Sequence, residues 1–224
     1  MSDQYNTNPG VRGSYNSTSD PLAVTSLSLG LEARGGRMLK IIPRGTRYPC
    51  IFEENLQTSR DHVFSVHFGI YEGERAKVEN NRKIAGLLLE LDNTNNRRGY
   101  PLKVVFKIGI NGILTVTLVE VKTGKTAKIK INYDGKPQDD PDIRRIVQEA
   151  KEHEREDAEF IELFNKREAF KKEAYTKLIE KKSKNQTTLV IVQIYPDWSD
   201  KPPNDIREYD KKLTDLDRKI ARYL

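Results

Sequence analysis

The chain is poor in cysteine and has no long apolar run. Cys50 is the single cysteine among 224 residues, so an internal disulfide framework is excluded and a reducing compartment is favoured. Because Cys50 lies in a predicted strand, we interpret it as a small buried hydrophobe. No apolar run reaches the roughly 18 residues of a membrane helix, and the first residues lack a basic-then-apolar signal. The sequence therefore predicts a soluble, cytoplasmic protein with no membrane partner.

Residue patterns that support catalysis are also missing. The three histidines, His62, His67 and His153, lack metal-ligand spacing, and the two that are close together point to opposite faces of a strand. The sequence contains no Gly-x-Ser-x-Gly motif and no Cys/His pair. We therefore predict no catalytic residue, no metal site and no enzymatic activity.

The charge excess is mild and dispersed. Lys and Arg total 39 against 33 Asp and Glu, which gives a formal net charge of +6. Mixed signs at this density are more typical of a solvated surface than of a nucleic-acid footprint, so we expect no nucleic-acid partner. A basic nucleic-acid binder stays open as an alternative, which a strong salt dependence of binding would support.

Short apolar runs bounded by Gly and Pro dominate residues 24–136 and predict strands joined by loops. Leu102 to Ile108 alternates with period two, as a half-buried strand does. Asn111-Gly112 follows, which predicts a hairpin with a type I′ turn. About eight strands with no helical pattern between them predict an antiparallel two-sheet β-sandwich. Residues 1–23, which have almost no aliphatic side chains, are expected to be disordered.

The composition changes to a helical pattern after the strands. Asp139 to Asp142 reads as a helix start, and apolar residues then recur at helical spacing to about Lys182. We assign residues 137–183 to a helix or kinked helix pair about 60 Å long, which must lie across the sandwich and extend past it. Residues 184–203 are predicted to be an irregular linker and residues 204–224 a C-terminal helix. The fold class is thus β plus α, a sandwich followed by a helical lid.

The stretch from Thr25 to Arg75 carries a family resemblance. It contains TSLSLGLEARGG, then MLKIIPRGTRYP, then YEGER, with no gap in spacing. It resembles the start of the substrate-binding domain of the seventy-kilodalton heat-shock chaperone family, and RGYPLKVVFKIGINGILTV and Asp142 to Ala150 continue the likeness. The matched positions are Thr25, Leu27 to Glu32, Gly35, Gly36, Met38, Ile42 to Arg44, Thr46, Pro49 and Tyr71 to Arg75.

The resemblance implies capture of an extended peptide through its backbone, with one apolar side chain in a pocket between two sandwich loops. The pocket would be lined by Leu31, Leu56, Val66 and Phe68, although plain core is the alternative at such strand positions. The expected peptide-binding residues are Leu31, Ala33, Arg34, Leu56, Gln57, Ser59, Val66 and Phe68.

The sequence departs from the family in two places. Arg34 and Ser59 stand where the family closes an arch over the peptide with apolar side chains, which predicts a looser arch and a preference for acidic peptides. The lid latch of the family matches Asp61 and Arg98 on the loops, but Lys171 and Tyr175 stand on the lid side. A Lys171–Asp61 pair at an exposed site is worth only about 0–1 kcal/mol, so lid closure is left open.

Nothing ahead of the sandwich resembles a phosphate-cradling ATPase domain, so we expect no bound nucleotide and no other cofactor. The predicted function is ATP-independent, holdase-like binding of extended hydrophobic segments of unfolded proteins. The alternative is a structural or oligomerisation scaffold that has lost peptide binding. Co-chaperones, a separate ATPase and self-association stay open as further partners.

Overall fold

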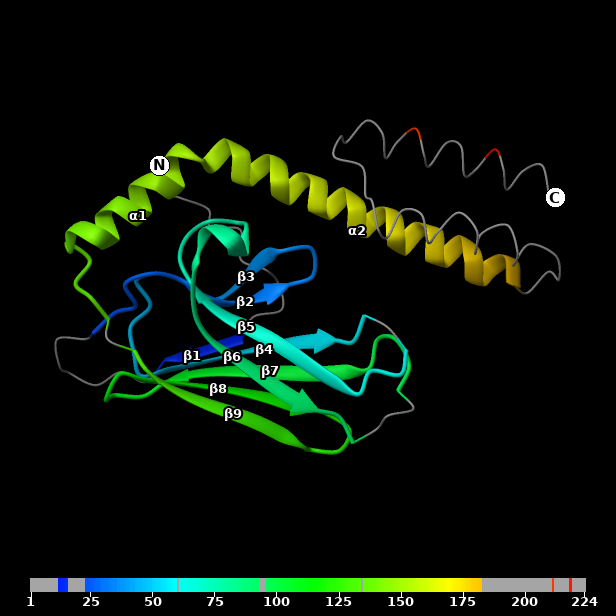
Figure 1. Ribbon diagram of the computed structural model, residues 1–224, viewed down its shortest axis with the longest axis horizontal. Helices are drawn as coiled ribbons and strands as arrows, with labels where there is room; N and C mark the ends of the chain where they lie inside the picture. Colours follow the sequence, from blue (N-terminus) through cyan, green and yellow to red (C-terminus); the bar gives the residue numbers. More distant parts are fainter. Residues whose placement is uncertain are drawn as a thin grey trace. The chain divides into compact units, whose positions relative to one another are not determined.

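The computed structural model describes residues 12–15, 23–59, 61–92, 96–133, 135–182, 211 and 218. Two antiparallel sheets carry the described strands, with the orders β1-β4-β7-β8-β9 and β3-β2-β5-β6 (Figure 1). The first sheet contains β1 (Arg12–Tyr15), β4 (Cys50–Gln57), β7 (Pro101–Ile108), β8 (Ile113–Glu120) and β9 (Thr126–Asn132). The second contains β2 (Leu29–Ala33), β3 (Arg37–Ile42), β5 (Ser65–Glu72) and β6 (Arg82–Glu90), with a short 3₁₀ helix, η1 (Val78–Asn80), before β6.

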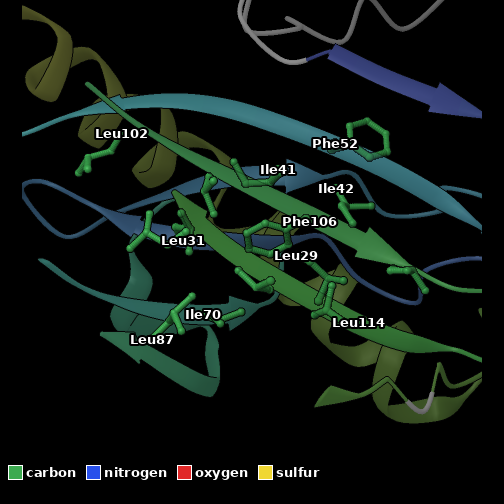
Figure 2. Packing of buried hydrophobic residues seen from close by; sticks show 14 of the residues in the cluster. Leu29, Leu31, Ile41, Ile42, Phe52, Ile70, Leu87, Leu102, Phe106 and Leu114 are labelled. Atoms are coloured by element: carbon green, nitrogen blue, oxygen red, sulfur yellow. The ribbon is translucent and has the colours of Figure 1, made fainter. Parts of the chain in front are cut away.

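Alternation along the strands places the core between the two sheets. In β8 the buried apolar residues are Leu114, Val116 and Leu118, each two positions from the next, and all three are fully buried. Phe106 of β7 and Leu29 of β2 are also fully buried, and they belong to the same cluster (Figure 2). The predicted β-sandwich followed by helices is confirmed.

Two features of the strand region differ from the prediction. Residues 1–23 were expected to be disordered, but residues 12–15 form strand β1, which pairs with the edge of β4. The Asn111-Gly112 turn is also of another type. The amide of Gly112 donates to the carbonyl of Gly109 at 3.0 Å, and only Gly112 of the two predicted positions has positive φ, at 70°. A longer turn with glycine in the left-handed position therefore replaces the two-residue type I′ turn.

Two helices follow the sandwich, α1 (Pro141–Glu152) and α2 (Glu154–Lys182), and His153 separates them. Asp140 caps α1, because its carboxylate accepts from the amides of Asp142 and Ile143. The chain divides into two compact units, residues 1–154 and 155–224, so α1 belongs with the sandwich. Of the segments 184–203 and 204–224, only Lys211 and Arg218 are described, and both are helical. The predicted linker and C-terminal helix otherwise lie outside the described residues.

The segment that joins the sandwich to α1 is fixed to the start of the sandwich. The amide of Ser26 donates to the Tyr133 hydroxyl at 2.8 Å, and the Ser26 hydroxyl donates to the carbonyl of Lys136. The side-chain amide of Gln138 donates to the carbonyls of Thr25 and Ser26 at 2.8 and 3.2 Å. These bonds connect the two ends of the sandwich's chain to one another, so the start of α1 has a defined position on the sandwich.

Candidate functional site

The predicted site residues gather where four connections meet at one end of the sandwich. We call this the loop end, and it comprises residues 34–36, 58–64, 91–100 and 121–125. These segments join β2 to β3, β4 to β5, β6 to β7 and β8 to β9, and because neighbouring strands are antiparallel they come to the same side (Figure 1). Residues 60 and 93–95 within them lie outside the described part of the chain.

Apolar side chains along β5 become progressively more exposed toward the loop end. Ile70 is fully buried, Phe68 and Val66 are half-buried, and Phe64, two residues before Val66, is 66% exposed. The apolar row therefore continues from the core to the solvent-exposed surface at the loop end.

The four residues predicted to line the pocket join one hydrophobic cluster. Leu31 of β2 pairs in register with Ile70, is 1% exposed and belongs to the central core. Leu56, Val66 and Phe68 are half-buried and pack against that core. Leu56 lies in the opposite sheet from the other three, opposite Leu102. Leu31 therefore lies at the bottom of this cluster, whereas the side chains of Leu56, Val66 and Phe68 are partly exposed.

The residues predicted for the arch lie on two connections of the loop end. Ala33 ends β2, and Arg34 is exposed in the three-residue turn that follows. Gln57 ends β4, and the exposed Ser59 follows two residues later. The structure thus brings the predicted arch positions to the same end as the apolar row, at its solvent-exposed side.

Thr58 fastens the connection between β6 and β7 to the end of β4. Its amide donates to the carbonyl of Tyr100 at 3.0 Å, and its carbonyl accepts from Gly99 at 2.9 Å. The Thr58 hydroxyl is within hydrogen-bond distance of the Tyr100 amide at 3.2 Å. This buried threonine therefore satisfies backbone groups that an irregular loop would otherwise leave unpaired.

Asn96 fixes the connection between β4 and β5 from the other side. Its side chain accepts from the Val63 amide at 3.0 Å and donates to the Val63 carbonyl at 2.7 Å. Its own carbonyl accepts from His62 at 2.8 Å, and His62 has a φ of 53°. Asn96 is 1% exposed. These bonds hold a backbone conformation that a residue other than glycine rarely adopts.

A fully buried carboxylate, that of Glu120, holds the third and fourth connections together. It accepts from the Tyr100 hydroxyl at 2.8 Å, the Asp92 amide at 3.0 Å and the Thr123 hydroxyl at 2.7 Å. Sequence reasoning missed Glu120, Thr58 and Asn96. A signal for Glu120 was present, because an acid follows Leu114, Val116 and Leu118 at the next core-facing position.

The loop half of the predicted latch is in contact within the sandwich. The carboxylate of Asp61 accepts from the backbone amide of Arg98 at 2.6 Å, and both residues are exposed. The side chains of Lys171 and Tyr175 lie outside the described residues, although both positions fall within α2. Pairing of the latch across the lid stays a prediction.

The one cysteine among the described residues is buried. Burial raises the pKa of the Cys50 thiol, so the side chain stays protonated and is a poor nucleophile near neutral pH. Among the residues that the structure describes, no three His, Cys, Asp or Glu side chains are grouped to hold a metal ion. None of the described helices is long and apolar enough to cross a membrane.

Comparison with known proteins decides the family. The model of the Hsp70 family, described as Hsp70 protein, matches residues 19–221. This chain belongs to the Hsp70 family. Three relatives match this chain over part of their length, and the chain spans about a quarter of each of them. They are heat shock 70 kDa protein 7, chloroplastic, of Arabidopsis thaliana (36% identical over 206 residues, 89% of this chain and 26% of the relative), heat shock 70 kDa protein 6, chloroplastic, of the same plant (35%, 89% and 26%), and the stromal 70 kDa heat shock-related protein of Spinacia oleracea (38% over 145 residues, 64% and 24%).

The comparisons correct two predictions. The prediction of no enzymatic activity was wrong as a statement about this kind of protein, because members of the Hsp70 family are ATPases. The motifs of these 224 residues cover only about a quarter of the length of the relatives. The prediction of a cytoplasmic location was also wrong, because these relatives are named as chloroplastic proteins. A reducing environment, which the single cysteine favoured, is not specific to the cytoplasm.

Proposed function

We propose that this chain is the substrate-binding part of an Hsp70 protein and that it binds extended, apolar segments of unfolded polypeptides. Supporting this is the row of Ile70, Phe68, Val66 and Phe64, which passes from the core into solvent between the loops. The binding step uses only the sandwich and proceeds without a bound nucleotide or other cofactor. The names of the relatives favour a chloroplast as the compartment. Membership of the Hsp70 family favours unfolded polypeptides and co-chaperones as partners.

The mechanism follows from the side chains of the slot. One aliphatic side chain of the guest would insert between Leu56, Val66 and Phe68, above the buried Leu31. Burying one leucine contributes roughly 1.5–3 kcal/mol, and each net backbone hydrogen bond adds about 1 kcal/mol. A handful of these, less the cost of ordering the peptide, corresponds to roughly micromolar affinity, or about −8 kcal/mol.

The test is fluorescence anisotropy with a short, leucine-centred peptide, measured without nucleotide. Val66→Phe fills the slot, so we expect the dissociation constant to rise about 10- to 100-fold, the equivalent of one lost leucine contact. The matched control is Leu88→Phe, which adds the same ring to β6 at an exposed position paired with His67. Equal affinities for the two variants would refute capture in this slot.

A scaffold that has lost peptide binding is the second candidate function. The burial of Leu31, which is 1% exposed, favours it, because a pocket floor with so little exposed surface resembles a closed core. Arg34 and Lys171, which differ from the residues of the family at these positions, also favour the scaffold. On this alternative the parent protein would show no peptide binding at high micromolar concentration, and sedimentation would show self-association.

A further inference from the structure

The outer edge of β4 is half covered and half open. Strand β1 pairs antiparallel with β4 in the register Arg12–Glu53, Gly13–Phe52, Ser14–Ile51 and Tyr15–Cys50 (Figure 1). On its other side β4 pairs with β7 along its whole length, from Cys50 to Gln57. Residues 54–57 therefore lack a strand partner on the β1 side among the described residues.

The covered half of β4 has more apolar residues than the uncovered half. Cys50, Ile51 and Phe52 precede Glu53 in the covered half, and each pairs with a residue of β1. The uncovered half has the sequence Glu-Asn-Leu-Gln, which begins with a charge and contains one apolar residue, Leu56. An open, apolar strand edge is a template for pairing with another chain, whereas a charged edge opposes pairing. Strand β1 thus covers the part of the edge with the strongest tendency to add a strand.

The chain is also anchored to the sandwich close to the position where β1 pairs. The carbonyl of Ala23 accepts from the Tyr48 amide at 3.1 Å, and Val24 forms an antiparallel bridge with Arg47. Only residues 16–22 separate this anchor from the end of β1, and Tyr48 is two residues from Cys50. Because β1 and this anchor belong to one chain, the pairing of β1 with β4 is intramolecular and competes with any second chain at the same edge. Four residues of strand pairing are weak alone, so the tether keeps the edge occupied.

From these observations we propose that the edge at Cys50–Glu53 is a second polypeptide-binding site, which binds extended chain by strand addition. The segment Arg12–Tyr15 is its occupant in cis, and an extended segment of another polypeptide takes its place when it leaves. Recognition is through main-chain hydrogen bonds, with a preference for a basic residue in register with Glu53. This site uses the rim of one sheet and is independent of the apolar slot between the sheets.

The geometry of an antiparallel ladder provides a matched pair of variants. Alternate residues of β1 direct their N–H groups toward β4, and the others direct them away. Proline has no N–H and is tolerated only where that group faces outward. Of the double variants Arg12→Pro/Ser14→Pro and Gly13→Pro/Tyr15→Pro, one should release β1 and the other should leave it bound. Each is made in the full chain.

Amide hydrogen exchange measures the release. Two of the four amides from Cys50 to Glu53 face β1, and the alternate two face β7. In the releasing variant we expect exchange of the first two to accelerate by about tenfold or more, with the other two unchanged. Unchanged exchange in both variants, or equal acceleration of all four amides, would overturn the assignment of β1 as the occupant of this edge.

Binding in trans is tested by NMR with a peptide of residues 9–18. We expect it to shift the amide signals of Cys50–Glu53 in the releasing variant, with affinity weaker than micromolar, and to bind the parent protein at least about tenfold more weakly because the tethered strand competes. Shifts at Val66–Phe68 alone would show that the peptide enters the slot and not the edge. That result, or no shifts at millimolar peptide, would refute the second site. Failure of the Val66→Phe test would leave this result unaffected.

Discussion

The strongest test of the loop-end architecture is removal of the Glu120 carboxylate. Glu120→Ala leaves the Tyr100 hydroxyl, the Asp92 amide and the Thr123 hydroxyl without their acceptor, and the Tyr100 side chain is buried. Each hydrogen bond to a charged group contributes about 1.5–3 kcal/mol, and these losses are not additive. Because three such bonds are lost together, we expect a loss of about 3–5 kcal/mol in the free energy of unfolding.

Urea denaturation monitored by circular dichroism measures this loss. With a slope of about 2 kcal/mol per molar, the midpoint should fall by roughly 1.5–2.5 M. Glu90→Ala is the matched control, because Glu90 is an exposed glutamate at the end of β6, and we expect a change within about 0.5 kcal/mol. Glu120→Gln should lie between the two, since it keeps one acceptor oxygen and adds an amide donor. A loss below about 1 kcal/mol for Glu120→Ala would refute the claim that this carboxylate holds the connections together.

Three further predictions concern other parts of the molecule. Burial raises the pKa of Tyr133 to about 12, so the folded state favours the neutral phenol. The free energy of unfolding that this contributes below pH 10 should fall by about 2–3 kcal/mol as the pH rises through 12. Urea titrations at pH 9 and 11.5 measure the fall, and Tyr133→Phe should lessen it. Gln138→Ala removes two hydrogen bonds to residues 25–26 and should lower the free energy of unfolding by about 1–2 kcal/mol in the same assay. Gln148→Ala, on the exposed face of α1, is the control and should lower it by less than about 0.5 kcal/mol. Equal losses would contradict a helix start that is fixed to the sandwich. Arg34→Ala should abolish the preference for acidic residues near the centre of bound peptides on an array, and a basic-flanked preference in the parent would exclude that role of Arg34.

The strand pattern was predictable because burial imposes a period of two. Leu102 to Ile108 and Leu114 to Leu118 alternate in the sequence as they do in the sandwich, so the layers could be derived before the structure. The hairpin at Gly112 was placed correctly but given the wrong turn type, since the dipeptide does not determine the loop length. Strand β1 could not be predicted, because its pairing depends on the edge of β4 and on an anchor at Ala23, not on its own apolar content.

The candidate site was predictable only in part. The resemblance gave the register that groups Leu31, Val66 and Phe68, and the structure adds that Leu31 is buried while the others are not. The roles of the polar side chains at the loop end could not be predicted from the sequence, because Thr58 and Asn96 hydrogen-bond to backbone atoms that only folding brings near. No local pattern records such long-range partners.

The bonds of Ser26 to Tyr133 and Lys136 have a mechanical consequence. The segment just before β2 and the segment just after β9 are joined to one another directly, and the strands from β2 to β9 form a closed loop. Tension applied to the flanking segments would act first on the pairing of β1 with β4 and on this junction, and the strands from β2 to β9 would remain unloaded until the junction broke. A pulling experiment should therefore show a small initial rupture before the sandwich unravels.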